Sequence, residues 1–185
     1  MRRERIIFMG TPDIARIYLQ SLIENQYNII AAFTQPPRKQ GRGMKIHKSP
    51  VHKLAVESNI PVFYPKNFAN LDTTNEFKKL NPEIVIVMGY GLLLPIPILQ
   101  IPIYGCINIH VSLLPRWRGA SPIEHAILYG DSTTGVSIFK LEEQLDTGPI
   151  IAVQKINIDK NITKGSLTSQ LNRIGTSLLN KTLPK

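Results

Sequence analysis

The sequence has 185 residues, of which 43% are hydrophobic and 19% are charged, and its formal net charge is +9. This length and composition are typical of one globular domain and exclude a disordered or fibrous chain, while the excess of basic residues favours an anionic partner. A single cysteine excludes an internal disulfide framework and a multi-cysteine metal site, and no apolar run approaches the ~20 residues of a membrane-spanning helix.

The N-terminus is basic but does not have the pattern of a secretory signal. Three arginines lie within the first five residues, yet only four apolar residues follow before Gly10-Thr11-Pro12. A signal peptide needs an apolar region of roughly 7 to 15 residues. We therefore expect a cytoplasmic protein that has no membrane partner.

Short apolar segments alternate with helix-start signals through the first half of the chain. Thr11-Pro12-Asp13 is typical of a helix N-terminus with Thr11 as the cap, and Ser49-Pro50 repeats that pattern. Residues 84–88 lack polar alternation, as expected of a central strand buried on both faces. In chain order we predict strand 5–9, a helix to residue 25, strand 28–33, a helix from 50 to 58, strand 62–64, helix 72–80 and strand 84–88.

The second half continues this alternation. We predict a final helix with one apolar stripe of Leu167, Leu171, Ile174 and Leu178. Strand-helix alternation indicates an α/β fold that is Rossmann-like, with a mainly parallel sheet and helices on both faces. Such sheets bind ligands beyond the carboxyl ends of their strands. The elements predicted here are strand 105–111, helix 122–129, strands 134–140 and 150–158, and helix 167–179.

A basic segment lies between the second predicted strand and the helix that follows it. Residues 34–53 contain six basic residues, two histidines and no acid. Pro36-Pro37 and the glycines at 41 and 43 predict an irregular loop over its first part. This excess of positive charge favours binding to a polyanion, and the alternative is a solvated loop whose charges serve only solubility.

Two polar side chains interrupt the apolar strand at 105–111. Strand alternation places Asn108 and His110 on the same face as Cys106, with the Asn108 and His110 Cα atoms roughly 6.6 Å apart. An amide donor beside an imidazole suits a reaction that develops negative charge on oxygen and moves a proton. The alternative is a buried pair whose hydrogen bonds are made by the backbone.

Other chemistries fit the sequence less well. One glycine in Gly10-Thr11-Pro12-Asp13 does not make a dinucleotide fingerprint, and no P-loop motif is present. Cys106 and His110 lie roughly 13 Å apart on an extended strand, too far for a nucleophilic pair. The four histidines do not repeat a metal spacing, so we expect no metal. Trp117 either stacks on a ligand ring or anchors its own turn.

The sequence around Asn108 and His110 resembles that of the folate-dependent formyltransferases. Their signature is an Asn-x-His strand, a Ser-Leu-Leu-Pro turn and a later Asp-x-Gly loop, which correspond here to Asn108-Ile109-His110, Ser112 to Pro115 and Asp146-Thr147-Gly148. Among these families, the methionyl-tRNA formyltransferases are the most similar. Further matching segments span most of the chain: 7–13, 33–36, 41–43, 90–95 and 116–123.

The resemblance implies a formyltransferase fold and transfer of a formyl group from 10-formyltetrahydrofolate to the α-amine of initiator methionyl-tRNA. Asn108 would then donate to the developing oxyanion, His110 would add a charged hydrogen bond, and Asp146 would orient His110 or collect a proton through water. Folate would lie against two turns. The positions implied are Tyr90, Gly91, Leu92, Ser112, Leu113, Leu114 and Pro115.

The basic segment resembles the insertion by which the family reaches the tRNA acceptor end. The implied tRNA contacts are Arg38, Lys39, Arg42, Lys45 and Lys48. Residues 1–185 correspond to the catalytic domain, without the C-terminal barrel that the family normally carries, and we expect a monomer. Two alternatives stay open: a formyltransferase for a small amine (glycinamide ribonucleotide or an amino sugar), and a shortened RNA-binding relic without turnover.

Overall fold

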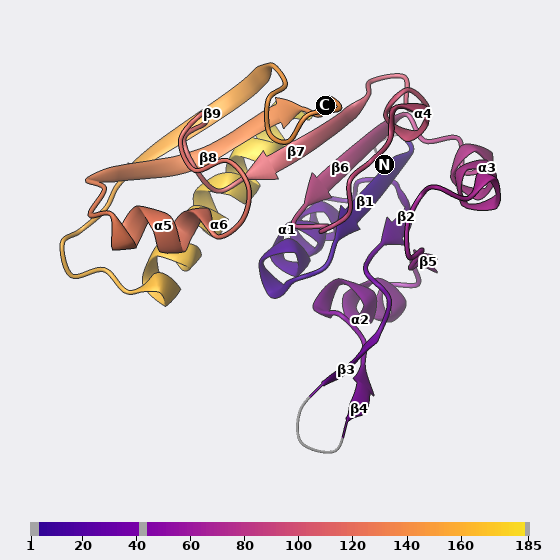
Figure 1. Cartoon of the computed structure of the whole chain (residues 1–185), viewed down its shortest axis with the longest axis horizontal. Coiled ribbons are helices and arrows are strands. Elements are labelled where there is room, and N and C mark those ends of the chain that lie inside the picture. The colour runs from indigo at the N-terminus through magenta and orange to yellow at the C-terminus, as the bar shows by residue number, and fades with distance from the viewer. Residues whose placement is uncertain (1–3, 41–43, 184–185) are drawn as a thin grey trace. The chain divides into compact units, whose positions relative to one another are not determined.

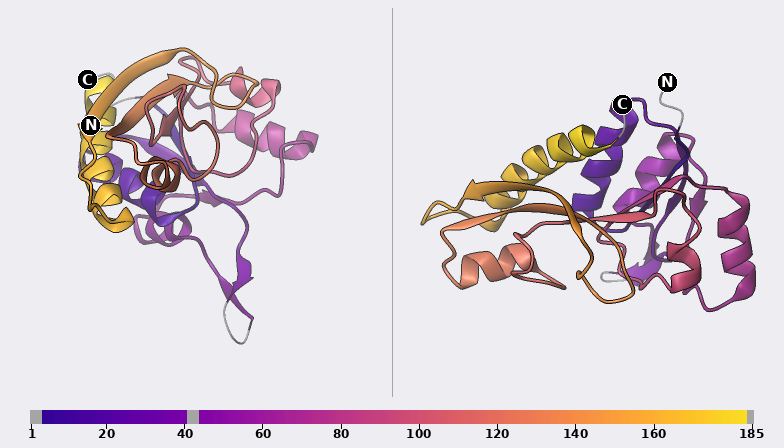
Figure 2. Two further views of the ribbon diagram at one scale, coloured as in Figure 1. Left: turned by 60° about the vertical axis from the view of Figure 1, so that its left-hand side comes forward. Right: turned by 90° about the horizontal axis from the view of Figure 1, so that it is seen from above.

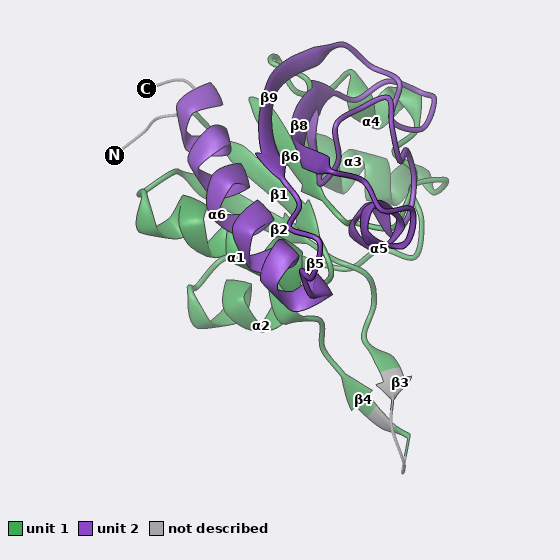
Figure 3. Ribbon diagram, turned by 90° about the vertical axis from the view of Figure 1, so that its left-hand side faces the viewer, with its two compact units in different colours: residues 1–106 green, residues 107–185 purple. Residues whose placement is uncertain are grey.

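A computed structural model describes residues 4–40 and 44–183 of the chain. These residues form two compact units, residues 1–106 and 107–185, coloured separately in Figure 3. Each unit is described by itself below. No helix among the described residues is both long enough and apolar enough to cross a membrane.

Unit 1 is built on parallel strands. Their order is β5 (Val62–Phe63), β2 (Ile29–Phe33), β1 (Ile6–Gly10) and β6 (Ile84–Met88) (Figure 1). β1 pairs in parallel with both β2 and β6, and β2 pairs in parallel with β5. Every residue of β1 and β6 is buried, because the two central strands are covered on both faces. The prediction for residues 84–88 is thus confirmed.

The helices of unit 1 are α1 (Asp13–Glu24), α2 (Pro50–Glu57), α3 (Leu71–Lys79) and the short α4 (Ile96–Leu99), of which α4 was not predicted. Ser49 caps α2 as expected, since its Oγ accepts from the His52 N–H at 3.0 Å. The expected Thr11 cap of α1 is wrong. Pro12 occupies the cap position without a side-chain hydrogen bond, and Thr11 Oγ1 instead donates to the Tyr90 carbonyl at 3.0 Å.

The basic segment forms a β-hairpin where we predicted an irregular loop (Figure 1). β3 (Arg38–Gln40) and β4 (Lys45–His47) pair antiparallel, with Arg38 opposite His47. Pro36 and Pro37 lack the N–H that a ladder needs, but they precede β3 and leave its pairing intact. The glycines at 41 and 43 lie outside the described residues.

Unit 2 contains the antiparallel strands. β7 (Cys106–His110) pairs with β8 (Thr133–Lys140), and β8 pairs with β9 (Ile150–Asn157). α6 (Lys164–Thr182) packs against β8 and β9, and α5 (Pro122–Leu128) lies on the other side of these strands (Figure 2). The predicted α/β class is confirmed: parallel strands make unit 1, and an antiparallel set makes unit 2.

The buried stripe of α6 differs from the predicted one. Leu167, Leu171, Gly175 and Leu179 are buried at four-residue steps, whereas Ile174 and Leu178 are half-buried. Residues four apart lie one above the other on a helix, while a step of three turns away from that line. The face of α6 that packs toward β8 and β9 therefore consists of the residues spaced four apart. The apolar pattern of the sequence did not show which of the two stripes would be buried.

Candidate active site

Unit 2 brings together the three polar side chains predicted to be catalytic, which we call the trio: Asn108, His110 and Asp146. Asn108 and His110 are alternate residues of β7, and Asp146 lies in the loop between β8 and β9. The Asp146 Oδ2 atom lies 3.8 Å from His110 Nδ1, and Asn108 Nδ2 donates to Asp146 Oδ1 at 3.5 Å. His110 and Asp146 are buried and Asn108 is half-buried. Asp146, a loop residue 38 positions after Asn108, thus faces Asn108 and His110 on β7.

The loop around Asp146 is shaped by its backbone. Asp146 has a φ of +52°, a left-handed conformation that Asp tolerates better than most residues. A Cβ on Gly148 would lie 1.8 Å from the Lys140 carbonyl oxygen, so only glycine permits this close approach of two chain segments. The carboxylate is also held by the Gly119 N–H, which donates to Asp146 Oδ2 at 2.7 Å.

His110 has one ring nitrogen occupied by the protein backbone. Its Nε2 lies 2.7 Å from the Trp117 carbonyl oxygen. A carbonyl only accepts, so Nε2 carries the hydrogen in this contact. Nδ1 faces Asp146 at a distance too long for a hydrogen bond but within reach of an ion pair when the ring is charged. Nδ1 is therefore the ring nitrogen that is available for chemistry.

Trp117 anchors its own turn, which decides between the two readings that the sequence left open. The indole ring stacks on His125 with centroids 5.2 Å apart and contacts Tyr129 at 4.8 Å. Its Nε1 donates to Asp131 Oδ2 at 2.7 Å. Trp117 has a φ of +59°, an uncommon conformation for a bulky residue. The ring contacts hold the chain in this conformation.

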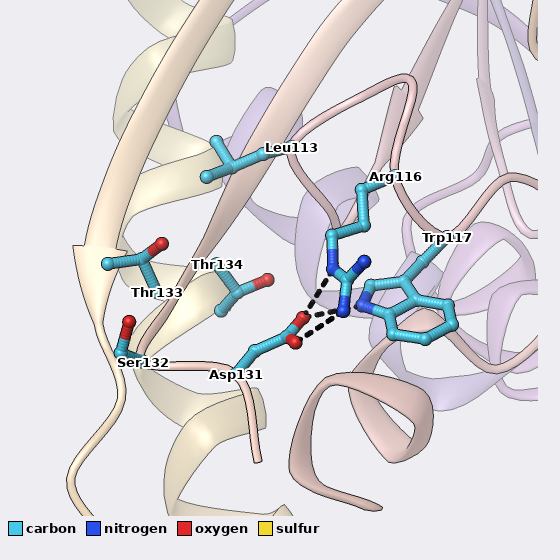
Figure 4. Close-up of a pocket in the computed structure, with 7 residues that line it drawn as sticks. All are labelled: Leu113, Arg116, Trp117, Asp131, Ser132, Thr133 and Thr134. Atoms are coloured by element: carbon cyan, nitrogen blue, oxygen red, sulfur yellow. Dashed lines mark hydrogen bonds and ion pairs between the residues drawn. The ribbon is translucent and has the colours of Figure 1, made fainter. Parts of the chain in front are cut away.

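Arg116 and Asp131 form an ion pair beside the indole (Figure 4). Arg116 Nε donates to Asp131 Oδ2 at 2.9 Å, and Nη2 donates to Oδ1 at 2.6 Å. These charge-assisted bonds lower the pKa of the Asp131 carboxyl, and the hydrogen bond from Trp117 lowers that pKa further. The same bonds to Asp131 raise the pKa of Arg116.

A small pocket of about 160 Å³ opens beside this ion pair. Its wall includes the buried Thr134, whose hydroxyl has no hydrogen-bond partner among the described residues and points toward Arg116 and Asp131 in Figure 4. This pocket is therefore lined by hydroxyl, charged and apolar side chains together. The lining residues are Leu113, Arg116, Trp117, Asp131, Ser132, Thr133 and Thr134.

The predicted folate-binding turn of unit 2 is tied to β8 by a residue that sequence reasoning missed. Ser137 Oγ donates to the Ser112 carbonyl at 2.7 Å and accepts from the Leu114 N–H at 3.1 Å. Ser112 is buried, and its own hydroxyl donates to the Arg116 carbonyl at 2.6 Å. Leu113 and Leu114 are half-buried, and Pro115 is exposed.

The predicted folate-binding turn of unit 1 is held by Gln35. Gln35 Nε2 donates to the Gly91 carbonyl at 3.0 Å, and a Cβ on Gly91, whose φ is +80°, would lie 2.4 Å from that nitrogen. The Tyr90 side chain is buried, its carbonyl accepts from Thr11, and Leu92 is half-buried. Burial raises the pKa of the Tyr90 phenol.

Four of the five predicted tRNA-binding residues lie on or beside the hairpin of unit 1. Arg38 in β3 is exposed and donates to the Gln35 side-chain oxygen, and Lys48 is exposed just after β4. Lys39 and Lys45 lie opposite Ile46 and Gln40 in the ladder, and Arg42 lies outside the described residues. Gln35 thus links the base of the hairpin to the turn at Gly91.

The family model for formyl transferase matches residues 4–183. The chain belongs to the formyl transferase family. The resemblance inferred from the sequence is thereby confirmed.

Curated relatives cover nearly all of this formyltransferase chain but are longer. The methionyl-tRNA formyltransferase of Clostridioides difficile is 46% identical over 179 residues, which make up 97% of this chain and 58% of the relative. That of a Wolbachia species from Drosophila simulans is 49% identical over 97% of this chain and 60% of the relative. The chain thus spans about three fifths of the length of these relatives.

Solved structures share the fold of this chain. The phosphoribosylglycinamide formyltransferase of Bacillus halodurans has a TM-score of 0.79 at 25% identity, covering 97% of this chain and 93% of that one. WlaRD, a sugar 3N-formyl transferase solved in the presence of dTDP and 5-N-formyl-THF, has a TM-score of 0.68 at 22% identity, covering 98% of this chain and 62% of that one.

Sequence reasoning predicted the trio but missed the two backbone groups that bind it, the Trp117 carbonyl and the Gly119 N–H. It also missed the Asp131 carboxylate, which binds the Trp117 side chain. The type of residue at a position does not predict which partners its backbone N–H and carbonyl bind. Asp131 follows Tyr129-Gly130 in a predicted turn, where an acidic residue is ordinarily read as turn chemistry.

We expect the protein to lose part of its stability in acid through Asp131. The folded carboxyl has a lowered pKa, while the unfolded one titrates near its ordinary value of about 4. The contribution to the free energy of unfolding is therefore complete above about pH 4 and disappears as the pH falls through the folded pKa. Asp131→Asn should be less stable than the parent at pH 7, and this difference should shrink at pH 3.

Urea unfolding followed by the fluorescence of the single tryptophan, Trp117, measures this difference. Glu124→Gln is the matched control, because Glu124 pairs with Lys164, which also lowers its pKa, but the Glu124 side chain is 44% exposed against 11% for Asp131. Glu124→Gln should therefore lower the free energy of unfolding less than Asp131→Asn does. A parent and an Asp131→Asn variant with parallel pH dependence would contradict the assignment.

Proposed function

We propose that this chain transfers a formyl group from 10-formyltetrahydrofolate to the α-amine of methionyl-initiator tRNA, as part of translation initiation. The observation that carries the proposal is the meeting of Asn108, His110 and Asp146 in unit 2 of a formyl transferase family member. Relatives that are 46–49% identical are named methionyl-tRNA formyltransferases, which supports tRNA as the acceptor.

The transfer is a substitution at the formyl carbon. The amine nitrogen forms a bond to that carbon and loses a proton, while the bond from the carbon to the folate nitrogen breaks and this nitrogen gains a proton. The tetrahedral intermediate carries negative charge on the former carbonyl oxygen. Hydrogen-bond donors aimed at that oxygen lower the barrier, because they are held in place before the charge develops.

The three side chains supply the groups that this step needs. Asn108 Nδ2 makes only a long hydrogen bond to Asp146, so an amide hydrogen is available to the oxyanion. His110 donates from Nδ1 when protonated, since Nε2 is held by the Trp117 carbonyl. Asp146 faces Nδ1 and accepts, through a water, the proton that the amine loses.

Folate-binding residues are proposed in each unit taken by itself: residues 90–92 in unit 1 and residues 112–115 in unit 2. The solved WlaRD structure with 5-N-formyl-THF, from a protein of the same fold, supports a folate-type donor. The carbonyls of Tyr90, Gly91 and Ser112 and the Leu114 N–H already have partners within the protein. The other backbone groups of the two turns are proposed as the polar contacts for the pterin. The protein is proposed to act in the cytoplasm as a monomer.

A second candidate is formyl transfer to a small amine such as glycinamide ribonucleotide or an amino sugar. The TM-score of 0.79 to a phosphoribosylglycinamide formyltransferase favours it. The exposed basic hairpin favours tRNA, because a small acceptor needs no extended cationic surface. An RNA-binding chain without turnover is the third possibility.

A single-turnover assay distinguishes the three functions. The chain is mixed with 10-formyltetrahydrofolate and, in separate reactions, with methionyl-initiator tRNA, glycinamide ribonucleotide or an amino sugar nucleotide, and formylated product is measured. We expect product with the charged tRNA alone. Product with a small amine alone would establish the second function, and tRNA binding without product would establish the third.

The basic hairpin predicts a salt-dependent tRNA affinity. Each phosphate that a basic side chain neutralises contributes about 0.9 to the slope of log K against log salt. Arg38→Ala combined with Lys48→Ala should therefore weaken binding and flatten the slope by about 1.8, and Arg42→Ala should flatten it by a further ~0.9. Filter binding between 50 and 200 mM salt measures the slope.

Lys78→Ala is the control for this experiment. Lys78 lies in the last turn of α3 and is exposed, so the substitution removes the same charge from another part of unit 1. Its slope should equal that of the parent. Equal slopes in the hairpin variants and the parent would show that the hairpin side chains face solvent in the complex.

A further inference from the structure

We propose that Asp131 is a positioning residue that holds the trio in place through residues 116–119. The kinetic part of this proposal rests on the proposed function. The structural part does not, because it concerns contacts within unit 2. Asp131 itself makes no recorded contact with Asn108, His110 or Asp146, so its effect on them must pass through the 116–119 segment.

Two side chains of the 116–119 segment, Arg116 and Trp117, are bound to Asp131. Its carboxylate accepts hydrogen bonds from Arg116 Nε at 2.9 Å, Arg116 Nη2 at 2.6 Å and Trp117 Nε1 at 2.7 Å. The Asp131 side chain is 11% exposed, whereas that of Arg116 is 55% exposed. Asp131, the largely buried partner of the ion pair, thus accepts hydrogen bonds from both the Arg116 and the Trp117 side chains (Figure 4).

The backbone of the same segment is bound to the trio. The Trp117 carbonyl accepts from His110 Nε2 at 2.7 Å, and the Gly119 N–H donates to Asp146 Oδ2 at 2.7 Å. These two bonds orient the imidazole and the carboxylate. One four-residue segment therefore connects Asp131 to both His110 and Asp146.

The segment depends on its anchors because the backbone conformation of Trp117 is unfavourable. Trp117 has a φ of +59°, where a bulky side chain is uncommon. Such a conformation persists only where the surroundings hold it. Stacking on His125 contributes to holding the indole, and the hydrogen bond from its Nε1 to Asp131 fixes the direction of the ring and so of the Trp117 carbonyl. The two bonds from Arg116 hold the neighbouring residue to the same carboxylate.

The first experiment reads the contacts directly in the folded chain by NMR. In the parent, the Gly119 amide should exchange slowly with solvent, and the His110 ring should carry its hydrogen on Nε2. Asp131→Ala should speed Gly119 exchange by about tenfold or more relative to the parent and mix the two ring tautomers, since the hydrogen bonds lose their fixed partners. Glu124→Gln, which breaks the ion pair with Lys164, should change neither.

Trp117→Phe provides a variant that keeps the group in contact with His110. The Trp117 carbonyl belongs to the backbone and survives the substitution, while the indole N–H that binds Asp131 is lost. If the His110 tautomers shift in this variant, the cause is a displaced Trp117 carbonyl, because the carbonyl itself is still present. Asp131→Asn and Asp131→Glu cover the case in which Asp131→Ala does not fold, and Glu, which keeps the carboxylate, should restore more Gly119 protection than Asn.

The second experiment uses turnover. Asp131→Ala should lower kcat for formyl transfer by about 10- to 10²-fold while KM changes little, because displaced catalytic groups affect the transition state and not the bound substrate. A folded Asp131→Ala with parental Gly119 exchange, parental His110 tautomers and parental kcat would overturn the proposal. A parent that transfers formyl to no acceptor would refute the function, and the NMR comparison would still decide the role of Asp131.

Discussion

His110→Ala is expected to lower the rate of the proposed formyl transfer by about 10² or more while folate affinity stays close to that of the parent. The substitution removes the ring nitrogen Nδ1 that faces Asp146, and with it the hydrogen that the proposed mechanism directs to the oxyanion. Asn108→Ala would remove the proposed neutral oxyanion donor, for which the expected loss is on the order of 10² to 10³. Single-turnover rates and calorimetric folate titration measure the two quantities separately.

The three side chains should behave as one unit. Asp146→Ala leaves His110 Nδ1 without its facing carboxylate, so this loss should resemble that of His110→Ala. The double variant should be little slower than the slower single variant, because groups that serve one step are strongly non-additive. Fully additive losses, or near-parental rates for His110→Ala, would return His110 to a structural role in β7. Glu124→Gln serves as the control for an unrelated carboxylate in unit 2.

Gly148→Ala is expected to damage both stability and turnover. The added Cβ would lie 1.8 Å from the Lys140 oxygen and 3.0 Å from the Lys140 carbonyl carbon, and both atoms belong to the backbone of β8. The loop must move to relieve this overlap, which in packed sites costs about 1 to 3 kcal/mol. Asp146, two residues earlier, moves with it, so the rate should fall together with the free energy of unfolding.

Gly165→Ala is the matched control. It adds the same methyl group near the start of α6, where the nearest atom is Thr163 Oγ1 at 3.9 Å. Because alanine favours helix over glycine, this variant should gain up to about 1 kcal/mol. Urea unfolding followed by Trp117 fluorescence compares the two. A Gly148→Ala variant as stable as the parent would mean that the β8–β9 loop adapts without strain.

Local patterns explain why several elements were predictable. Residues 84–88 are five apolar residues in a row, and such runs become strands buried on both faces. Ser49-Pro50 starts α2 because a hydroxyl caps a free N–H and proline needs none. Asn108 and His110 were placed on one face of β7 by the two-residue period of a strand.

Other elements depended on contacts that no local pattern contains. Thr11 has the side chain of a good cap, yet its hydroxyl is used by the carbonyl of Tyr90, 79 positions away. The hairpin at β3 and β4 forms by pairing across residues 41–43, although proline and glycine flank or interrupt the segment. The buried face of α6 was selected by the strands against which it packs.

The strand that carries Asn108 and His110, the family resemblance and the concentration of positive charge in residues 34–53 could be predicted from the sequence. Side-chain period, composition and motif spacing are properties of neighbouring residues, so they can be read without a fold. The folded chain was needed to show that Asp146, 38 positions after Asn108, meets the pair, that the Trp117 carbonyl and the Gly119 N–H bind it, and that Asp131 binds the Trp117 side chain. Hydrogen bonds act over about 3 Å, and which distant groups come that close is set by the path of the whole chain.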